Sequence, residues 1–192
     1  MVDPLAAAVE ALRNGEIVVY PTDTLVGLGA SATDARAVDR LVVAKGRPDG
    51  MPLSIAFSSL EEVEPYVTLS EEARSFCRRR LPGPYTALAA ATPLARRRLA
   101  PPILAAGRSV GFRVPDHPIA RELARRVGPI VATSANRHGE PPALDRESAR
   151  RVFGRTVSVY LPMRPPPSGI PSRLVDLSGA EPRELPRGGR RP

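Results

Sequence analysis

The 192-residue sequence predicts one mixed α/β domain. Segments with helical spacing and short β-branched runs alternate along the whole chain, which is the pattern of an α/β fold. Their order is irregular, and we therefore expect a sheet that mixes parallel and antiparallel strands and is flanked by helices. No internal repeat is evident, and a chain of this length fits a single domain.

The first half of the chain predicts helices and strands in an uneven order. Apolar positions between 5 and 14 recur at helical spacing and stop at Gly15, a suitable C-cap. A second apolar stripe begins at Asp34 and ends near Gly46, because Pro48 blocks its continuation. The predicted helices here are 5–14, 34–44, 59–67 and 70–81, the predicted strands are 16–20, 52–57 and 85–91, and 22–33 is an expected loop.

The second half continues this alternation. Pro118 fits the first position of a helix, and the apolar run that ends at Thr133 is typical of a buried strand. The predicted strands are 109–115, 129–133, 156–161, 173–177 and 182–186, and the predicted helices are 117–128 and 145–153. Segment 162–171 is rich in proline, but only residues 172–192 follow it, so we interpret it as a loop within the domain.

Charge and cysteine content limit the class of protein. The net charge of +8 and the pI of about 10.8 favour an anionic partner, although short arginine runs are also typical of solvated helix faces. Cys77 is the only cysteine, so no intrachain disulfide can form, and we expect it to have a structural role in a helix. The N-terminus lacks the pattern of a signal peptide and no apolar run approaches the ~20 residues of a membrane span, so we expect a soluble cytoplasmic protein.

The stretch "GLGASA" resembles a dinucleotide-binding fingerprint, but its context argues against that function. The fingerprint needs a turn directly after a strand and a helix that opens on the second glycine. Here "PTDTLV" separates the strand from Gly27, and the next helix begins only near Asp34. The next predicted strand also lacks the acidic residue that would bind a ribose. A nicotinamide enzyme therefore remains a minor alternative.

Lys45 is the only lysine among the 28 lysines and arginines of the chain, and it stands two residues before Arg47. An ammonium is a compact point charge, whereas a guanidinium is a planar fork suited to two phosphate oxygens. Together they suit a polyphosphate at a loop bend and could offset charge in a transferring adenylyl group. A basic helix C-terminus is the structural alternative, but an arginine would serve that purpose equally well.

Polar residues at the ends of two apolar strands form further candidates. Ser134 and Asn136 follow a buried strand, where ligands gather in α/β sheets, although both residue types are also common in turns. Arg113 lies inside an apolar strand, so it needs an anionic partner from the protein or from a ligand. The chain shows neither the spacing of a zinc site nor an evident Ser-His-Asp arrangement.

These pieces together resemble a known family. "YPTDTLVGLGA", "KGRPDGMPL", "LPGPYTALAA", "VGFRVPDHP", "VATSANRHGEPP" and "SGIPSRLVDL" are similar, in this order, to motifs of the YrdC family, the threonylcarbamoyl-adenylate synthases. The similarity covers about residues 10–187, which leaves a short basic C-terminal tail. It implies a YrdC-like fold with a twisted sheet and a concave basic face.

The resemblance also implies a reaction and a site. Family members convert L-threonine, bicarbonate and ATP with Mg²⁺ to threonylcarbamoyl-AMP and pyrophosphate, for the N6-threonylcarbamoyl modification of tRNA adenosine by downstream proteins. Lys45 and Arg47 would be catalytic and hold the ATP phosphates. Ser134 and Asn136 would lie between the nucleotide and the threonine, and Arg187 would contact the nucleotide. The residues expected to contact the threonine or its carbamate are Thr22, Arg113 and Ser172. No protein ligand for Mg²⁺ is expected, because the ion arrives with ATP.

Two residues depart from the family pattern. Val26 stands where an aromatic residue is usual, and Arg173 stands where longer members carry a small residue. The alternative function is a non-catalytic protein that binds tRNA or double-stranded RNA on the same basic surface, and weak tRNA binding is expected in either case. The chain has four tyrosines, four phenylalanines and no tryptophan, so it has few of the aromatic side chains on which single-strand binders stack nucleobases.

Overall fold

The computed structural model of the protein describes residues 3–48, 50–105 and 108–186. Asp3, Asp34, Ser70, Thr92 and Asp145 cap helices with their side chains, as their polar oxygens favour. The helices are α1 (Pro4–Arg13), α2 (Ala35–Lys45), α3 (Leu60–Val63), α4 (Glu71–Arg80), α5 (Pro93–Arg98), α6 (Pro118–Val127) and α7 (Arg146–Phe153), with the 3-10 turns η1 (Pro101–Ile103) and η2 (Gly154–Thr156).

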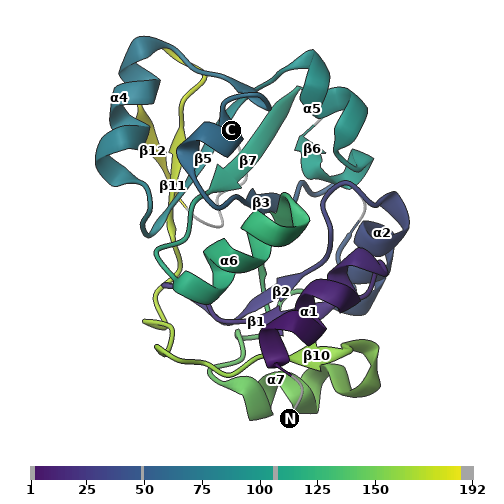
Figure 1. The fold of residues 1–192 in the computed structure, drawn as a ribbon. Helices are drawn as coiled ribbons and strands as arrows, with labels where there is room; N and C mark the ends of the chain where they lie inside the picture. Colours follow the sequence, from purple (N-terminus) through teal and green to yellow (C-terminus); the bar gives the residue numbers. More distant parts are fainter. Residues whose placement is uncertain (1–2, 49, 106–107, 187–192) are drawn as a thin grey trace.

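The strands of the described residues form two sheets (Figure 1). The smaller sheet has the order β10-β1-β2-β9, with β10 (Val159–Tyr160), β1 (Val18–Tyr20), β2 (Gly27–Gly29) and β9 (Thr133–Ser134). The larger sheet has the path β12-β11-β5-β7-β3-β8, with β12 (Arg183–Leu185), β11 (Arg173–Asp176), β5 (Tyr85–Ala91), β7 (Ser109–Arg113), β3 (Ser54–Ala56) and β8 (Ile130–Val131). Off this path, β4 (Val67–Thr68) pairs with β5 and β6 (Leu104–Ala105) pairs with β7.

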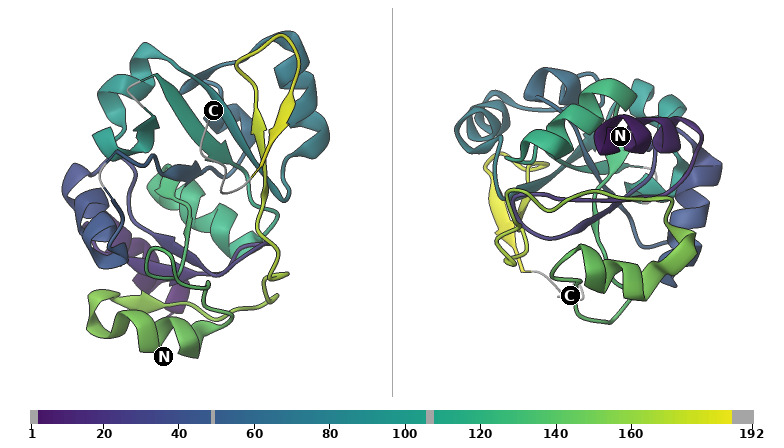
Figure 2. Two further views of the ribbon diagram at one scale, coloured as in Figure 1. Left: turned by 180° about the vertical axis from the view of Figure 1, so that it is seen from behind. Right: turned by 60° about the horizontal axis from the view of Figure 1, so that its bottom comes forward.

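Both sheets mix strand directions, which confirms the predicted fold class. The pairs β1–β10, β5–β11 and β3–β7 are parallel, and the remaining pairs are antiparallel. The hairpin β11–β12 forms one edge of the larger sheet (Figure 2). The proline-rich segment 162–172 links β10 in the smaller sheet to β11 in the larger one (Figure 1).

The two sheets meet where β8 passes into β9. The Val131 amide donates to Ala30 O beyond β2, at 2.8 Å, and the Ala132 amide donates to Ser54 O of β3, also at 2.8 Å. Neighbouring amides of one segment therefore bond to different sheets. The candidate site lies at this junction.

The core is aliphatic, with few aromatic side chains. One buried cluster joins α2 to the inner residues of both sheets, and a second lies between α1, α6, β1 and β8. Helices α1 and α6 pack together in front of the sheets in Figure 1. Cys77 is a fully buried free thiol of the first cluster, as predicted. Within the described residues, no helix is long and apolar enough to cross a membrane.

The prediction of a loop over 22–33 was wrong, because Gly27 and Gly29 belong to β2. Glycine is uncommon in strands, but the Tyr20 ring of β1 covers these two positions. A Cβ atom at Gly27 would lie 2.9 Å from the Tyr20 ring, and one at Gly29 would lie 2.8 Å from it. The glycines thus make room for a buried ring and do not open a helix, which removes the basis of a nicotinamide site.

Short elements account for the other differences. The predicted helix over 59–67 is α3 alone, and the chain then enters the two-residue strand β4. Helix α5 was not predicted, because it has six residues and Ala95 is the only buried one among them. The helical stripe that a longer helix would show is therefore absent from its sequence.

Candidate active site

A small cavity of about 210 Å³ lies at the junction of the two sheets. It is smaller than the ~300–1,000 Å³ of typical pockets for drug-sized ligands. Two arginines, Arg47 and Arg113, line it, and no lining residue in the described part of the chain is a carboxylate. Its other lining residues are Tyr20, Thr22, Thr24, Leu25, Val26, Gly27, Pro52, Leu53, Ser54, Thr86, Ala132, Thr133, Ser134 and Ser172. The cavity therefore suits a small anionic ligand with further polar groups.

Thr22 shapes the turn that forms one wall of the cavity. Its hydroxyl donates to Leu25 O at 2.7 Å and accepts from the amides of Thr24 and Leu25 at 3.1 and 3.2 Å. The Thr24 hydroxyl lies 3.0 Å from it. These bonds hold the segment between β1 and β2 in one shape, with Thr22 and Thr24 buried.

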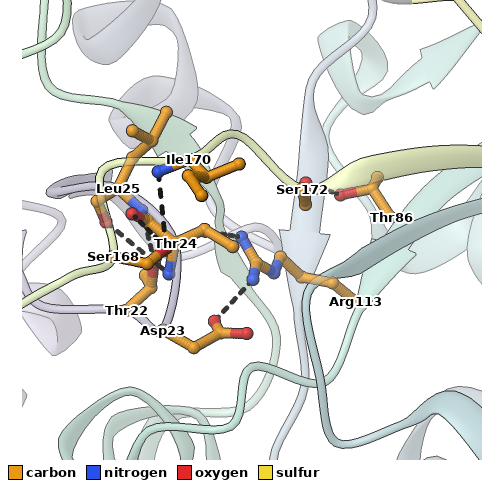
Figure 3. Close-up of polar contacts among 9 residues, drawn as sticks. All are labelled: Thr22, Asp23, Thr24, Leu25, Thr86, Arg113, Ser168, Ile170 and Ser172. Carbon is orange, nitrogen blue, oxygen red and sulfur yellow. Dashed lines mark hydrogen bonds and ion pairs between the residues drawn. The ribbon is translucent and has the colours of Figure 1, made fainter.

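Arg113 finds its anionic partner within the protein (Figure 3). Its guanidinium donates to Asp23 Oδ1 at 2.6 Å and to Thr24 Oγ1 at 2.8 Å. Arg113 Nε and Asp23 Oδ2 are buried and have no hydrogen-bond partner. Burial lowers the pKa of Arg113 while the Asp23 charge raises it. The sequence predicted a partner for Arg113 but did not identify Asp23.

The proline-rich segment also contacts this turn (Figure 3). The amides of Ser168 and Gly169 donate to Asp23 O and Thr24 O at 3.2 and 2.8 Å. Further along, the Ser172 hydroxyl lies 2.7 Å from Thr86 Oγ1 of β5. The chain between Ser168 and Ser172 is therefore bonded to both sides of the cavity.

Lys45, the last residue of α2, does not line the cavity and is 2% exposed. Its ammonium donates to Ser134 O at 2.6 Å, to Asn136 O at 2.9 Å and to Asn136 Oδ1 at 3.2 Å. Burial, and then the nearby Arg47 charge, lower the pKa of Lys45 from 10.5 to about 8. Lys45 therefore links the end of α2 to Ser134 of β9 and to Asn136 in the loop that follows.

Arg47 reaches the cavity from the bend after α2. Gly46 adopts the left-handed conformation (φ +59°) that ends the helix and turns the chain. Arg47 Nε and Nη2 then donate to Met51 O and Pro52 O at 3.3 and 2.8 Å. Its half-buried guanidinium is thereby fixed, and Nη1 makes no hydrogen bond with a described residue.

Ser134 and Asn136 form a small network beside Lys45. The Ser134 hydroxyl donates to Asn136 Oδ1 at 2.6 Å, and Asn136 Nδ2 donates to Arg137 O and Glu140 O at 2.9 and 2.6 Å. The side chain of Asn136 thus holds the loop after β9 in shape, and Ser134 faces the cavity.

The predicted residues fall into three groups. Thr22, Arg47, Arg113, Ser134 and Ser172 line the cavity. Lys45 and Asn136 do not line it: Lys45, expected at the ATP phosphates, instead bonds Ser134 O and Asn136, and Asn136 bonds the Ser134 hydroxyl. Arg187 lies outside the described residues.

Sequence reasoning missed Asp23, Thr24, Ser54, Thr86 and Thr133. Ser54 carried the same signal as Arg113, because it is the one polar side chain inside the apolar run "PLSIAF". Asp23 and Thr24 lie in the motif "PTDT", from which the family resemblance implied a role for Thr22 alone. Thr86 and Thr133 had no distinguishing signal, because threonine is common in strands.

Among the described residues there is no group of three or more histidine, cysteine, aspartate or glutamate side chains that could hold a metal ion. The cavity offers hydroxyls and guanidinium groups, and a guanidinium repels a cation. This donor set fits Mg²⁺ only as an ion that enters together with a phosphate substrate.

The fold and the cavity define a mixed α/β domain with a small cavity, lined by two arginines, at the junction of two sheets. The model of the Sua5/YciO/YrdC family, described as "Telomere recombination", matches residues 10–189. The chain therefore belongs to the Sua5/YciO/YrdC family, as its motifs indicated.

Individual relatives agree with this assignment. The chain is 40% identical over 182 residues to a putative threonylcarbamoyl-AMP synthase of Mycobacterium tuberculosis, covering 94% of this chain and 82% of the relative. It is 36% identical over 159 residues to the threonylcarbamoyl-AMP synthase of Chromohalobacter salexigens, covering 82% and 84%. The crystal structure of P. abyssi Sua5 complexed with L-threonine superposes with a TM-score of 0.84 at 30% identity, over 96% of this chain and 54% of Sua5.

Proposed function

We propose that this protein is a threonylcarbamoyl-AMP synthase, which converts L-threonine, bicarbonate and ATP to L-threonylcarbamoyladenylate and pyrophosphate. The observation that carries the proposal is the small cavity with two arginines, many hydroxyls and no lining carboxylate in the described chain. Relatives named for this reaction cover most of the chain, and a similar structure holds L-threonine, which supports the same substrate here.

The volume of the cavity implies separate binding places for the amino acid and for ATP. About 210 Å³ accommodates an amino acid and its carbamate but not a nucleotide as well. L-Threonine binds inside, near Arg113, Thr22, Ser134 and Ser172. ATP binds at the mouth, where Arg47 presents its free Nη1 to the phosphates, with Asn136 and Arg187 near the nucleotide.

The reaction needs positioned anions more than a nucleophilic side chain. The amine of L-threonine and bicarbonate condense to a carbamate with loss of water. A carbamate oxygen then bonds to the α-phosphorus of ATP, the bond from that phosphorus to the β-bridging oxygen breaks, and pyrophosphate leaves. Arg47 neutralises phosphate charge and Arg113 orients the amino acid, which together supply alignment and electrostatic stabilisation.

Lys45 supports this reaction without lining the cavity. Its charge adds to that of Arg47, and its three hydrogen bonds hold Ser134 and Asn136 in position. Mg²⁺ arrives with ATP and neutralises the phosphate oxygens. The product passes to proteins that modify tRNA adenosine, with weak tRNA binding by this protein, and we place the reaction in the cytoplasm, where ATP and tRNA are present.

The test is a reaction of the purified protein with L-threonine, bicarbonate, ATP and Mg²⁺. We expect pyrophosphate release that requires all substrates, and a mass spectrum with threonylcarbamoyl-AMP. Arg47→Ala should lower kcat/KM for ATP by about 10–100-fold, because a hydrogen bond to a charged group is lost. The matched control is Arg36→Ala, an exposed arginine at the start of the same α2 helix. No pyrophosphate from the wild type would refute the proposal.

A further inference from the structure

The hydroxyl groups of the cavity differ in whether the protein already uses them. The hydroxyls of Tyr20, Thr22, Thr24, Thr86, Ser134 and Ser172 each have a hydrogen-bond partner in the protein. Those of Ser54 and Thr133 have none among the described residues, although both residues line the cavity. An unpaired hydroxyl in a polar cavity is available to a ligand, whereas a paired one must first break a bond.

Ser54 is placed in the cavity by its neighbour on the next strand. It pairs with Gly111 of β7, and a Cβ atom at Gly111 would lie 3.0 Å from Ser54 Oγ. The glycine therefore leaves room for the Ser54 hydroxyl. Arg113 pairs with Ala56 in the same register, and residues two apart lie on one face of a strand. Ser54 and Arg113 thus share a face of the larger sheet.

Thr133 reaches the same space from the other side of the junction. It begins β9 of the smaller sheet, directly after Ala132, whose amide is bonded to Ser54 O. The two unpaired hydroxyls therefore come from adjacent backbone segments that belong to different sheets. All three side chains line the same cavity, where the Arg113 guanidinium suits the charged end of a ligand and the two hydroxyls suit a polar group.

We propose that the hydroxyls of Ser54 and Thr133 bind the side-chain hydroxyl of the substrate amino acid and are specificity-determining residues. This inference rests on the proposed function, in which that amino acid is L-threonine. L-Valine has the same shape with a methyl group in place of the hydroxyl. A site built to bond a substrate hydroxyl rejects such an analogue, because its own polar groups lose their partner.

The experiment compares kcat/KM for L-threonine and L-valine, from pyrophosphate release, in Ser54→Ala and Thr133→Val. Each variant should lower the value for L-threonine by about tenfold, the loss of roughly one buried hydrogen bond, and leave the value for L-valine unchanged or raised. The threonine-to-valine ratio should fall accordingly. Ser109→Ala is the matched control, because Ser109 is a half-buried serine of the neighbouring β7 that does not line the cavity.

Equal losses for both amino acids would mean that the residues only support the fold, and would overturn the inference. An unchanged ratio in both variants would overturn it as well. Either result leaves the proposed function intact if the wild type releases pyrophosphate with L-threonine. If the wild type turns over neither amino acid, calorimetric titration provides the same comparison, and equal binding of L-threonine by the wild type and both variants would refute the assignment.

Discussion

Lys45 shows why one position of an arginine-rich chain holds a lysine. Three acceptor oxygens surround its ammonium in a site that is 2% exposed. An ammonium directs three donors from one atom, whereas a guanidinium is a larger planar fork. The geometry therefore selects a compact group. The sequence argument assigned this compact charge to the ATP phosphates, whereas the structure shows it bonded to three oxygens of the protein.

Lys45→Arg should lose most of the activity although the charge is kept. The larger group must displace Ser134 or Asn136, and overpacking of this kind costs about 1–3 kcal/mol. The measurement is steady-state pyrophosphate release together with the urea midpoint. Arg36→Lys, on the exposed start of α2, is the control. Turnover close to that of the wild type would contradict the point-charge argument.

The pKa of Lys45 can be measured directly, because lysine labelled at Cε gives one signal from this chain. We expect a midpoint of about 8, below the ordinary 10.5, because the ammonium is buried beside Arg47. The folded state then releases the proton before the unfolded state does. The contribution of Lys45 to stability therefore rises between about pH 8 and pH 10.5, by at most about 1.4 kcal/mol for each pH unit. Lys45→Met should abolish this rise in urea unfolding, and a midpoint near 10.5 would refute the prediction.

Asp23→Asn tests the buried ion pair. The side chains of Arg113 and Asp23 are 8% and 12% exposed, so the neutral amide leaves a buried guanidinium without its counter-charge. We expect a loss of about 3–5 kcal/mol in the free energy of unfolding, the usual cost of breaking a buried pair. Urea denaturation measures it, with Asp39→Asn on the exposed face of α2 as the control. A loss below about 1 kcal/mol, typical of surface pairs, would contradict it.

The residues of the site differ in how far the sequence alone could predict them. Arg113 and Lys45 stood out because each broke a local rule, a charge within a strand and a lone lysine. Thr22 and Ser172 came from the family resemblance alone. Asp23 could not be assigned as the partner of Arg113, because 90 positions separate them and only the folded chain brings them together.

At the scale of elements, β2 shows a sequence rule overridden by packing. Gly29→Ala should destabilise the fold by about 1–3 kcal/mol, because the new Cβ would lie 2.8 Å from the Tyr20 ring and 3.3 Å from Val131 O. Thermal and urea unfolding measure the change. Gly179→Ala is the matched control, because its Cβ would meet nothing closer than 3.8 Å. Equal stability of the two variants would show that the Tyr20 ring can move.

The elements found from sequence were the long or strongly periodic ones. Helices α1, α2, α4, α6 and α7 have apolar stripes and capping residues, and they lie close to their predicted ranges. The elements β4, β6 and β9 have two residues each, which is too short for any periodicity. They exist because a partner strand lies beside them, and a partner distant in sequence leaves no local signal.

At the scale of the molecule, ligand binding should stabilise the fold. L-Threonine at one hundred times its dissociation constant adds about 2.7 kcal/mol, which corresponds to about 5–10 °C in Tm for a chain of this size. Differential scanning fluorimetry with and without the amino acid measures the shift, and L-valine at the same concentration is the control. An equal response to both amino acids would contradict a site that selects threonine.

The mixed fold class was predictable, but the division into two sheets was not. The irregular order of helices and strands already excluded a regular βαβ repeat. Which strand pairs with which depends on contacts between residues far apart, such as Val18 with Val159 and Ala56 with Arg113. Segments 129–133 and 156–161 were each predicted as one strand. Only the folded chain shows that 129–133 contributes β8 to the larger sheet and the start of β9 to the smaller one.

The junction at Val131 and Ala132 also bears on cooperativity. Their amides are bonded to Ala30 and Ser54, in segments that belong to different sheets. Separating the sheets must break bonds on both sides of a two-residue segment, so neither sheet can open far on its own. Residues of both sheets line the cavity, so we expect the substrate site to be lost as soon as the two sheets separate, even where each sheet keeps its own hydrogen bonds.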